Sequence, residues 1–376
     1  MRTLTTLDEM VVLRRGFDLP APSRRPGPVP VLGSAGISGW HDTVPPGPAA
    51  GPSVTVGRSG SSIGVATYHP GPCWPLNTTL FVEDFLGNDP RYVYYLLRSI
   101  DFRGYDSGSV QPSLNRNHIA GVKVSRPGIR EQRAIGALLG ALDDKIGVNE
   151  RIGATYEELL AAVFVRNGWD DEPTDRAGAT ALGSLVECNP VCPRPRLGAA
   201  GDAVYVDMAA VPAGGRRVTA WRRRPPAPGT RFRNGDTVLA RISPCLENGK
   251  TAFIDVLADG EVGVGSTEFI VLRARAGVPP LFAYAVARSA RFRRYAIGHL
   301  AGTSGRQRCP VDVLPGFPIR RPDPAELHRF GAEATAAFDH LRSLDAETAE
   351  LKALRDALLP RLIGGELRLT DGHHRQ

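Results

Sequence analysis

Hydrophobic side chains recur at three- and four-residue intervals in two long stretches of this chain, which is typical of a helix with one apolar face. The first stretch covers residues 135–163 and the second covers residues 330–358. Neither stretch contains a proline, and Pro127 and Pro322 precede them at positions that would stop a strand. The pattern predicts two long helices. The first of them, over residues 130–165, would span about 54 Å, a length typical of a coiled-coil rod.

Polar residues interrupt the apolar stripe of each predicted helix. Asn149 and Lys145 fall at seam positions of the first helix, and Thr348 and Arg355 interrupt the second. Polar seam residues commonly fix the register and the number of helices. The same pattern arises if these side chains lie in solvent, so both interpretations stand. The residues expected to pair the helices or to dock a partner are Gln132, Ile135, Leu142, Ile146, Leu341, Leu344, Leu351 and Leu358.

Outside the helices, short apolar runs repeat in the same order in both halves of the chain. Each half has a strand that ends in an arginine, Ser53–Arg58 and Asp236–Arg241. The matched positions lie roughly 180–195 residues apart, far more than a solenoid period, so the pattern predicts a duplicated domain. The later matches are Leu80–Val82 with Phe269–Val271, Tyr92–Ser99 with Leu281–Ser289, Gly108-Ser109 with Gly302-Thr303, and the predicted strands Ile119–Pro127 with Val313–Pro322.

The order of these elements predicts an α+β fold, in which two similar globular domains are joined by two long antiparallel coiled-coil helices. An antiparallel pair would place the two domains at opposite ends of a rod, related by a pseudo-two-fold axis, as in dimeric DNA readers that space two half-sites. The predicted boundaries are 1–128 for the first globular domain, 129–166 for the first helix, 167–180 for a linker, 181–322 for the second domain, 323–366 for the second helix and 367–376 for a tail.

The composition limits the class of protein. The chain has 376 residues, of which 42% are apolar and 23% are charged, so it can form real cores and two or three domains. No run of about 18 apolar residues occurs, and the N-terminus lacks the pattern of a secretory signal, so we expect a cytoplasmic protein without a membrane span. Five cysteines, an odd and low number, do not predict a disulfide framework. Cys188 and Cys192 have three residues between them but lack a second pair and a nearby His, so no metal site is predicted.

The formal net charge of +7 favours an anionic partner, and nucleic acid is the usual one. Nearly all of the positive charge is arginine, whose forked guanidinium binds phosphates and guanine edges. A GC-rich genome would also favour arginine, so clustering matters more than the total. One cluster, residues 216–233, contains seven arginines and no acidic residue, with Trp221 and Phe232 between them. We interpret it as a DNA-contacting loop, and a solvated charged loop is the alternative.

The candidate DNA-binding residues are arginine, lysine, serine and asparagine side chains in the two predicted globular domains. In the first domain they are Arg14, Arg15, Arg24, Arg25, Arg58, Ser61, Ser62, Asn115, Arg116 and Asn117. In the second domain they are Arg216, Arg217, Arg222, Arg223, Arg224, Arg241, Lys250 and Arg306.

Several motifs resemble the conserved regions of type I restriction-modification specificity subunits. The first group is Gln111–Asn115, Ile119–Pro127, Arg130–Ile135 and Leu142–Ile146, which together resemble the central conserved region of that family. Residues 351–366 resemble its C-terminal conserved region, and Leu239–Lys250 is similar to a motif within its target recognition domains. One departure is Pro324–His328, which lacks the Glu-Gln pair expected before the second helix.

The resemblance implies two target recognition domains that each read one part of a split sequence in double-stranded DNA. It also implies two long helices that dock two DNA methyltransferase subunits, to which motor-nuclease subunits can be recruited. S-adenosylmethionine, ATP and Mg²⁺ would belong to those partners, so this chain is expected to bind no cofactor and to have no catalytic residue of its own.

Two other classes of protein remain as alternatives. A coiled-coil scaffold with two protein-binding domains would owe its basicity to genome composition. A stand-alone enzyme is disfavoured by the motifs: residues 244–251 nearly spell a phosphate-binding loop, but proline replaces its first glycine and a strand-like segment follows. His118 and His299 lack a nucleophile and a carboxylate at a recognisable spacing.

Overall fold

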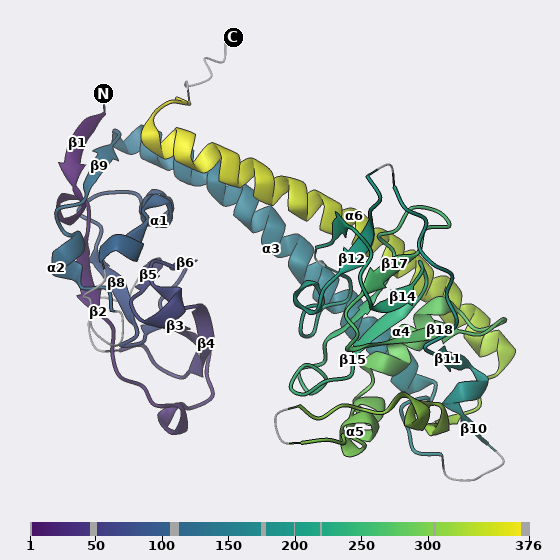
Figure 1. Ribbon diagram of the computed structural model, residues 1–376. Helices are drawn as coiled ribbons and strands as arrows, with labels where there is room; N and C mark the ends of the chain where they lie inside the picture. The colour runs from purple at the N-terminus through teal and green to yellow at the C-terminus, as the bar shows by residue number, and fades with distance from the viewer. Residues whose placement is uncertain are drawn as a thin grey trace, which may run out of the picture. The chain divides into compact units, whose positions relative to one another are not determined.

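The computed structural model describes residues 2–45, 51–105, 113–173, 178–198, 200–218, 220–303 and 306–369 (Figure 1). The chain forms two compact units. Unit 1 contains residues 1–149 and 346–376, and unit 2 contains residues 150–345. Gly108-Ser109, Gln111-Pro112 and parts of the predicted linker and tail lie outside the described residues.

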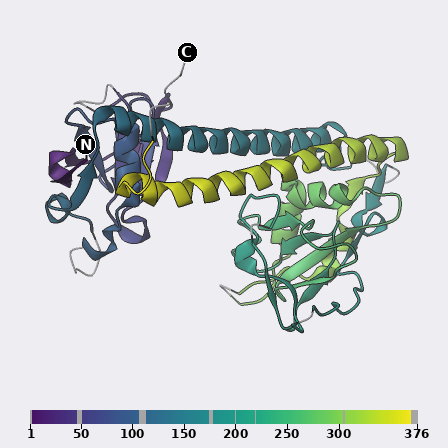
Figure 2. The same ribbon diagram turned by 90° about the horizontal axis from the view of Figure 1, so that it is seen from above.

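Two helices contribute residues to both units. Helix α3 is Ile129–Arg166 and helix α6 is Pro324–Gly364. In unit 1 Arg355 of α6 contacts Asp143 of α3, and Thr348 contacts Asn149. In unit 2 His340 lies against Tyr156. In unit 1 the contacting residue number on α6 decreases as the number on α3 increases, so the two helices run antiparallel there (Figure 2).

Some of the polar residues predicted at the seam between the helices are buried in it, and others lie in solvent. Asn149 is 2% exposed, and its side-chain amide donates to Glu347 Oε2 at 2.8 Å and to Thr348 Oγ1 at 3.2 Å. Arg355 is also buried. Lys145, by contrast, is about half exposed and pairs with Glu347 at 3.2 Å. Asn149 and Arg355 are therefore part of the packed seam, whereas Lys145 lies at its solvent edge.

Unit 1 is built on a four-stranded antiparallel sheet with the order β2-β8-β5-β6. Alternating apolar residues of its strands, such as Val54 and Val56, pack against helix α1, whose Tyr92, Val93 and Leu96 are buried. A second small sheet has the order β4-β3-β7, and strand β1 pairs with β9. The bounds are β1 Thr3–Thr6, β2 Val12–Arg15, β3 Val29–Gly33, β4 Gly36–His41, β5 Ser53–Gly57, β6 Ala66–His69, β7 Trp74–Pro75, β8 Thr79–Asp84, α1 Pro90–Ser99, α2 Arg116–Ile119 and β9 Lys123–Arg126.

Unit 2 repeats this plan. Its main sheet has the order β11-β18-β15-β16, and a second sheet has the order β13-β12-β17-β14. Helix α4 lies between the main sheet and helix α6: Tyr284 contacts Phe253 of β16 on one side and Phe338 of α6 on the other. Strand β10 pairs with β19 as β1 does with β9. The bounds are β10 Ala179–Ala181, β11 Val186–Cys188, β12 Ala203–Val206, β13 Arg222–Arg224, β14 Thr230–Phe232, β15 Thr237–Ala240, β16 Thr251–Phe253, β17 Gly263–Gly265, β18 Phe269–Ala274, α4 Pro280–Arg288, α5 Ala290–Gly298 and β19 Pro318–Arg320.

The duplication predicted from the sequence is therefore visible in the strand order, and the α+β fold class is confirmed. One match was wrong by a residue. Leu80 pairs with Val56 in unit 1 and Ile270 pairs with Leu239 in unit 2, so Leu80 corresponds to Ile270 and not to Phe269. The error arose because the match rests on continuous apolar runs, Leu80–Val82 and Phe269–Leu272, and a continuous apolar run does not define its own register.

The two strands predicted before the long helices are much shorter than expected. In unit 1 Asn115 caps the short helix α2 by accepting a hydrogen bond from the Asn117 backbone N–H at 3.0 Å. Helix α2 ends at Ile119, the first residue of the predicted strand, and a turn follows before β9 begins at Lys123. In unit 2 a 3-10 helix covers residues 311–316, with Pro310 before it and Pro315 inside it. Only β9 and β19 remain extended, because these capping and proline residues determine the local backbone before each strand begins.

Candidate nucleic-acid interface

Arg58 directly follows β5, the strand that lies between β8 and β6 in the main sheet of unit 1. Its backbone N–H donates to Thr78 O at 3.0 Å, and its backbone oxygen accepts from Leu114 N at 2.8 Å. The guanidinium donates to Asn77 O at 3.2 Å and to Ser113 Oγ at 3.0 Å, while its Nε is buried without a partner. The arginine is thus positioned by neutral groups rather than by a carboxylate.

Arg15, at the end of β2, adds a second positive charge beside Arg58. Burial and the charge of Arg15 together lower the pKa of the Arg58 guanidinium. Arginine side chains are protonated in proteins at neutral pH. Among the residues that the structure describes, neither guanidinium has a carboxylate partner. A pair of like charges without a counter-ion is a favourable place for an anion.

Hydroxyl and amide groups surround the two arginines. Ser34 Oγ lies 3.3 Å from Ser59 Oγ and donates to Thr78 O at 2.8 Å. A backbone bridge between Ser59 and Ser113 brings the segment before α2 beside the end of β5. The structure therefore gathers seven of the predicted residues around this strand end: Arg15, Arg58, Ser61, Ser62, Asn115, Arg116 and Asn117.

The other three predicted residues of the first domain lie elsewhere. Arg14 pairs with Glu83 at 2.6 Å, and Arg25 pairs with Asp42 at 2.8 Å. Arg24 donates to the backbone oxygen of Ser38 at 2.8 Å. Arg14 contacts the neighbouring strand β8, whereas Arg24 and Arg25 lie in the loop before β3; the charges of Arg14 and Arg25 are already balanced.

Arg241 occupies in unit 2 the position that Arg58 occupies in unit 1. It follows β15, its N–H donates to Glu268 O at 2.9 Å, and its oxygen accepts from Cys309 N at 2.8 Å. Its guanidinium makes no hydrogen bond or ion pair with any described residue, and its Nε is buried. Glu268 is instead held by Arg308 at 2.6 Å. The sequence match of the two arginines is therefore confirmed, and each of them has a buried Nε without a hydrogen-bond partner.

Lys250 and Arg306 lie on the segments beside Arg241. Lys250 O accepts from Ala240 N at 3.0 Å, and Lys250 Nζ donates to Met208 O at 2.9 Å. Arg306 is exposed, and its backbone oxygen lies 3.4 Å from the Arg308 guanidinium. Residues 242–249 form a tight turn between β15 and β16 rather than the start of a helix, so they do not form a phosphate-binding loop.

The arginine-rich segment predicted as one DNA-contacting loop is divided by the structure. Arg222, Arg223 and Arg224 form the edge strand β13. Arg223 pairs with Glu261 at 2.7 Å, and Arg224 lies 3.7 Å from the centre of the Tyr205 ring. These side chains remain at the surface, but part of their charge is neutralised.

Arg216 and Arg217 are used differently. Their side chains are only 18% and 14% exposed and both pair with Asp345 of helix α6; Arg217 also pairs with Asp255 at 2.7 Å. They join the second domain to its helix within unit 2. The sequence could not distinguish them from their neighbours, because their acidic partners are far away in the chain.

Sequence reasoning missed Arg293, which lies on α5 among Arg291 and Arg294. Its guanidinium lies against Gly249, in the turn after β15, and no described residue gives it a hydrogen bond or a carboxylate. The three arginines within four residues of this short helix could have indicated a DNA-contacting surface. The sequence alone would not have distinguished Arg293 from the other two.

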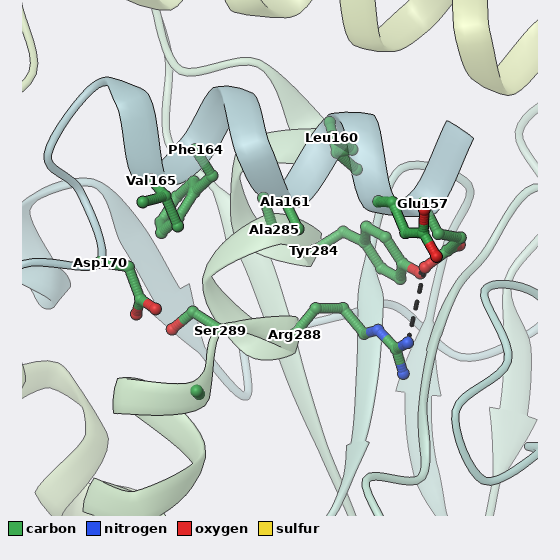
Figure 3. A pocket seen from close by; sticks show the side chains of 12 residues that line it. Glu157, Leu160, Ala161, Phe164, Val165, Asp170, Tyr284, Ala285, Arg288 and Ser289 are labelled. Carbon is green, nitrogen blue, oxygen red and sulfur yellow. Dashed lines mark hydrogen bonds and ion pairs between the residues drawn. The ribbon is translucent and has the colours of Figure 1, made fainter. Parts of the chain in front are cut away.

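A separate pocket of unit 2 lies between α3 and α4 (Figure 3). Its volume is about 380 Å³, and its walls are mostly apolar, with Leu160, Ala161 and Phe164 on the α3 side. At one end Tyr284 OH donates to Glu157 at 2.9 Å, and Arg288 lies 3.5 Å from the same carboxylate. Burial is the largest influence on Glu157 and raises its pKa.

No group of His, Cys, Asp or Glu suited to hold a metal ion is found in the part of the chain that the structure describes. Among the same residues no helix is long and apolar enough to cross a membrane.

The structure thus defines a duplicated α+β protein with a helix pair and with basic strand ends at equivalent places in both units. The same fold is seen in the crystal structure of the type I restriction-modification S subunit from M. genitalium. The TM-score is 0.63, and the match covers 98% of this chain and 97% of that one at 14% identity, which shows the fold.

Two sequence relatives are known specificity subunits. The chain is 28% identical over 146 residues to the EcoAI type I restriction enzyme specificity subunit of Escherichia coli, and 33% identical over 101 residues to that of EcoEI. These segments cover 39% and 27% of this chain but only 24% and 17% of the relatives. No family model matches the chain. The resemblance seen in the motifs, to type I specificity subunits, is confirmed by these relatives and by the fold.

Proposed function

We propose that this protein is the sequence-reading subunit of a type I restriction-modification complex. It reads a split target in double-stranded DNA and has no catalytic residues of its own. The domain in unit 1 reads one block of the target, and the domain in unit 2 reads the other. Because the two domains share a plan but differ in sequence, the two blocks differ as well.

One observation carries the proposal: the equivalent positions of Arg58 and Arg241. Both follow the matching strand of the main sheet, both have a buried Nε without a partner, and neither is paired with a carboxylate. A partly buried guanidinium that lacks a hydrogen-bond acceptor and a counter-ion destabilises the folded protein, unless an anion or a base edge completes its hydrogen bonds. Duplex DNA offers both phosphates and guanine edges.

The helices α3 and α6 are proposed to dock the methyltransferase subunits. Leu159 and Val165, both on α3, are 55% and 50% exposed, and the pocket of Figure 3 lies along the same helix. An apolar helical surface beside an apolar pocket is suited to a partner protein. S-adenosylmethionine, ATP and Mg²⁺ would be bound by partner subunits, including any motor-nuclease subunit.

Selection of DNA from a random library tests the reading function. The full chain, purified with its methyltransferase, should select a motif of two blocks separated by unspecified bases. Arg58→Ala should relax one block, and Arg241→Ala should relax the other. If both variants relax the same block, or if both leave the motif unchanged while DNA is still bound, the assignment of these arginines is wrong. Binding without any selected motif would favour the protein-binding scaffold.

Co-purification tests the docking surface. Ala161 lines the pocket on α3, whereas its neighbour Ala162 is also exposed but does not line it. Ala161→Arg should abolish co-purification of the methyltransferase because the long charged side chain fills the pocket. Ala162→Arg should leave co-purification intact. Retention of the partner by Ala161→Arg would place the docking surface elsewhere.

A further inference from the structure

We propose that Arg293, held against Gly249, binds a phosphate of the DNA backbone beside the site of Arg241. The inference rests on the proposed DNA-reading function and adds to it a contact that the sequence pattern did not assign. Its basis is the geometry of α5 and of the turn between β15 and β16.

Helix α5 holds its arginines in different environments. Ser289 caps the helix by accepting from Phe292 N at 3.2 Å, and Phe292 and Ala296 anchor it in the core. Arg291 lies over the Phe317 ring at 4.2 Å and donates to the backbone oxygen of Pro318, so it is part of the packing. Arg294 is exposed, and Arg293 is half-buried.

Gly249 makes room for the Arg293 guanidinium. Its φ is +68°, a conformation that favours glycine. A Cβ built on Gly249 would lie 2.9 Å from Arg293 Cζ and 3.1 Å from both of its Nη atoms. Any larger residue would therefore push the guanidinium away. The turn presents its backbone to the cation without supplying a hydrogen bond that would satisfy it.

The charges around Arg293 leave it without a counter-ion. Burial and the nearby positive charge of Arg288 both act to lower its pKa. Arg288 itself is already engaged by Glu157 at 3.5 Å and by Gly214 O at 3.0 Å. Among the described residues Arg293 has no carboxylate, hydroxyl or carbonyl partner. A phosphate would supply both the missing charge and the missing acceptors.

The turn that contacts Arg293 also belongs to the Arg241 site. Gly249 is followed by Lys250, whose backbone oxygen accepts from Ala240 N at 3.0 Å, one residue before Arg241. A phosphate at Arg293 would thus lie on the DNA strand next to the bases read near Arg241. This arrangement, in which a backbone contact positions a neighbouring base contact, is usual in DNA readers.

Salt-dependent DNA binding tests the inference. The probe is a fluorescein-labelled duplex of random sequence, and the protein is the full chain with its partner. Arg293→Gln should reduce the slope of log K against log salt by about 0.9, the value for one lost phosphate contact. Arg293→Lys should retain most of the slope because it keeps the charge. Gly249→Ala should weaken binding because the new Cβ displaces the guanidinium. Arg294→Gln, on the same helix, should leave the slope unchanged.

The possible outcomes separate the two proposals. If the wild-type complex binds the duplex but Arg293→Gln has an unchanged slope, the phosphate contact is wrong and the DNA-reading function stands. An equal fall for Arg293→Gln and Arg294→Gln would also overturn it, because the effect would then belong to the whole helix. If the wild-type complex does not bind the duplex at all, both proposals are wrong. Circular dichroism of each variant establishes that its fold is intact, and Arg293→Lys provides the comparison if Arg293→Gln does not fold.

Discussion

Arg355 of helix α6 donates from Nη1 to Asp143 Oδ1 of helix α3 at 2.6 Å, and the other carboxylate oxygen of Asp143 accepts from Tyr95 OH at 2.6 Å. One carboxylate thus joins both long helices to helix α1 of the first domain. Arg355 is 8% exposed, so the link lies within the packed seam of unit 1.

Arg355→Ala should lower the free energy of unfolding by about 2 kcal/mol, because it removes the closer of the two cations beside the half-buried Asp143, whose other oxygen lies 3.8 Å from Arg98. The matched control is Arg342→Ala on the same helix, whose pair with Asp339 is solvent-exposed and should contribute at most about 0.5 kcal/mol. Urea denaturation measures both values. Equal effects for the two variants would show that the seam pair has no special role.

Gly57→Ala should disrupt the first DNA site. A Cβ at Gly57 would collide with the backbone oxygens of Ser62 and Ser34, which belong to the segments around Arg58. We expect a loss of about 2 kcal/mol in stability, typical of overpacking, together with weaker DNA binding. Gly121→Ala is the control, since nothing lies near that position. Thermal unfolding and fluorescence anisotropy should show an effect for Gly57→Ala alone; wild-type behaviour of this variant would contradict the packing described.

Arg15→Ala should separate stability from function. Removing the like charge beside Arg58 relieves a repulsion, so stability should stay within about 0.5 kcal/mol of the wild type or rise slightly. DNA affinity should fall, and the salt slope should decrease by about 0.9 if Arg15 contacts a phosphate. A large loss of stability with unchanged DNA binding would make Arg15 a structural residue instead.

Glu157→Gln should change how stability depends on pH. Burial raises the pKa of Glu157 in the folded chain above its ordinary value of 4.5. Its ionised form is therefore disfavoured by folding, and the penalty grows as pH rises through the raised pKa. The stability of the wild type relative to Glu157→Gln should fall as the pH rises above about 4.5, the ordinary pKa, and should level off above the raised pKa. Urea denaturation at several pH values measures this difference, and a constant difference across the range would contradict the assignment.

The sequence predicted those elements whose pattern is contained in a continuous stretch of residues. Helical spacing located α3 and α6, and the arginine that ends each matched strand identified Arg58 and Arg241 as equivalents. The order of elements also predicted the duplicated fold. These features depend on periodicity and on matched strings of residues, both of which can be read from one chain.

Features that depend on distant partners could not be predicted. Arg216 and Arg217 are ion-paired with Asp345, more than a hundred residues away, so nothing near them in sequence separates them from Arg222–Arg224. Arg293 is singled out only by its contact with Gly249. The one-residue error at Leu80 has the same origin, since strand register is set by the neighbouring strand.

The most direct test of the account is to map DNA methylation across the genome of the native cells, with and without this gene. The account predicts that one split motif loses methylation when the gene is deleted, and that restoring the chain restores it. Restoring a chain whose residues 1–128 come from another specificity subunit should change one block of the motif and leave the other. An unchanged methylation pattern after deletion, in cells where a methyltransferase co-purifies with the chain, would contradict the account and favour a scaffold.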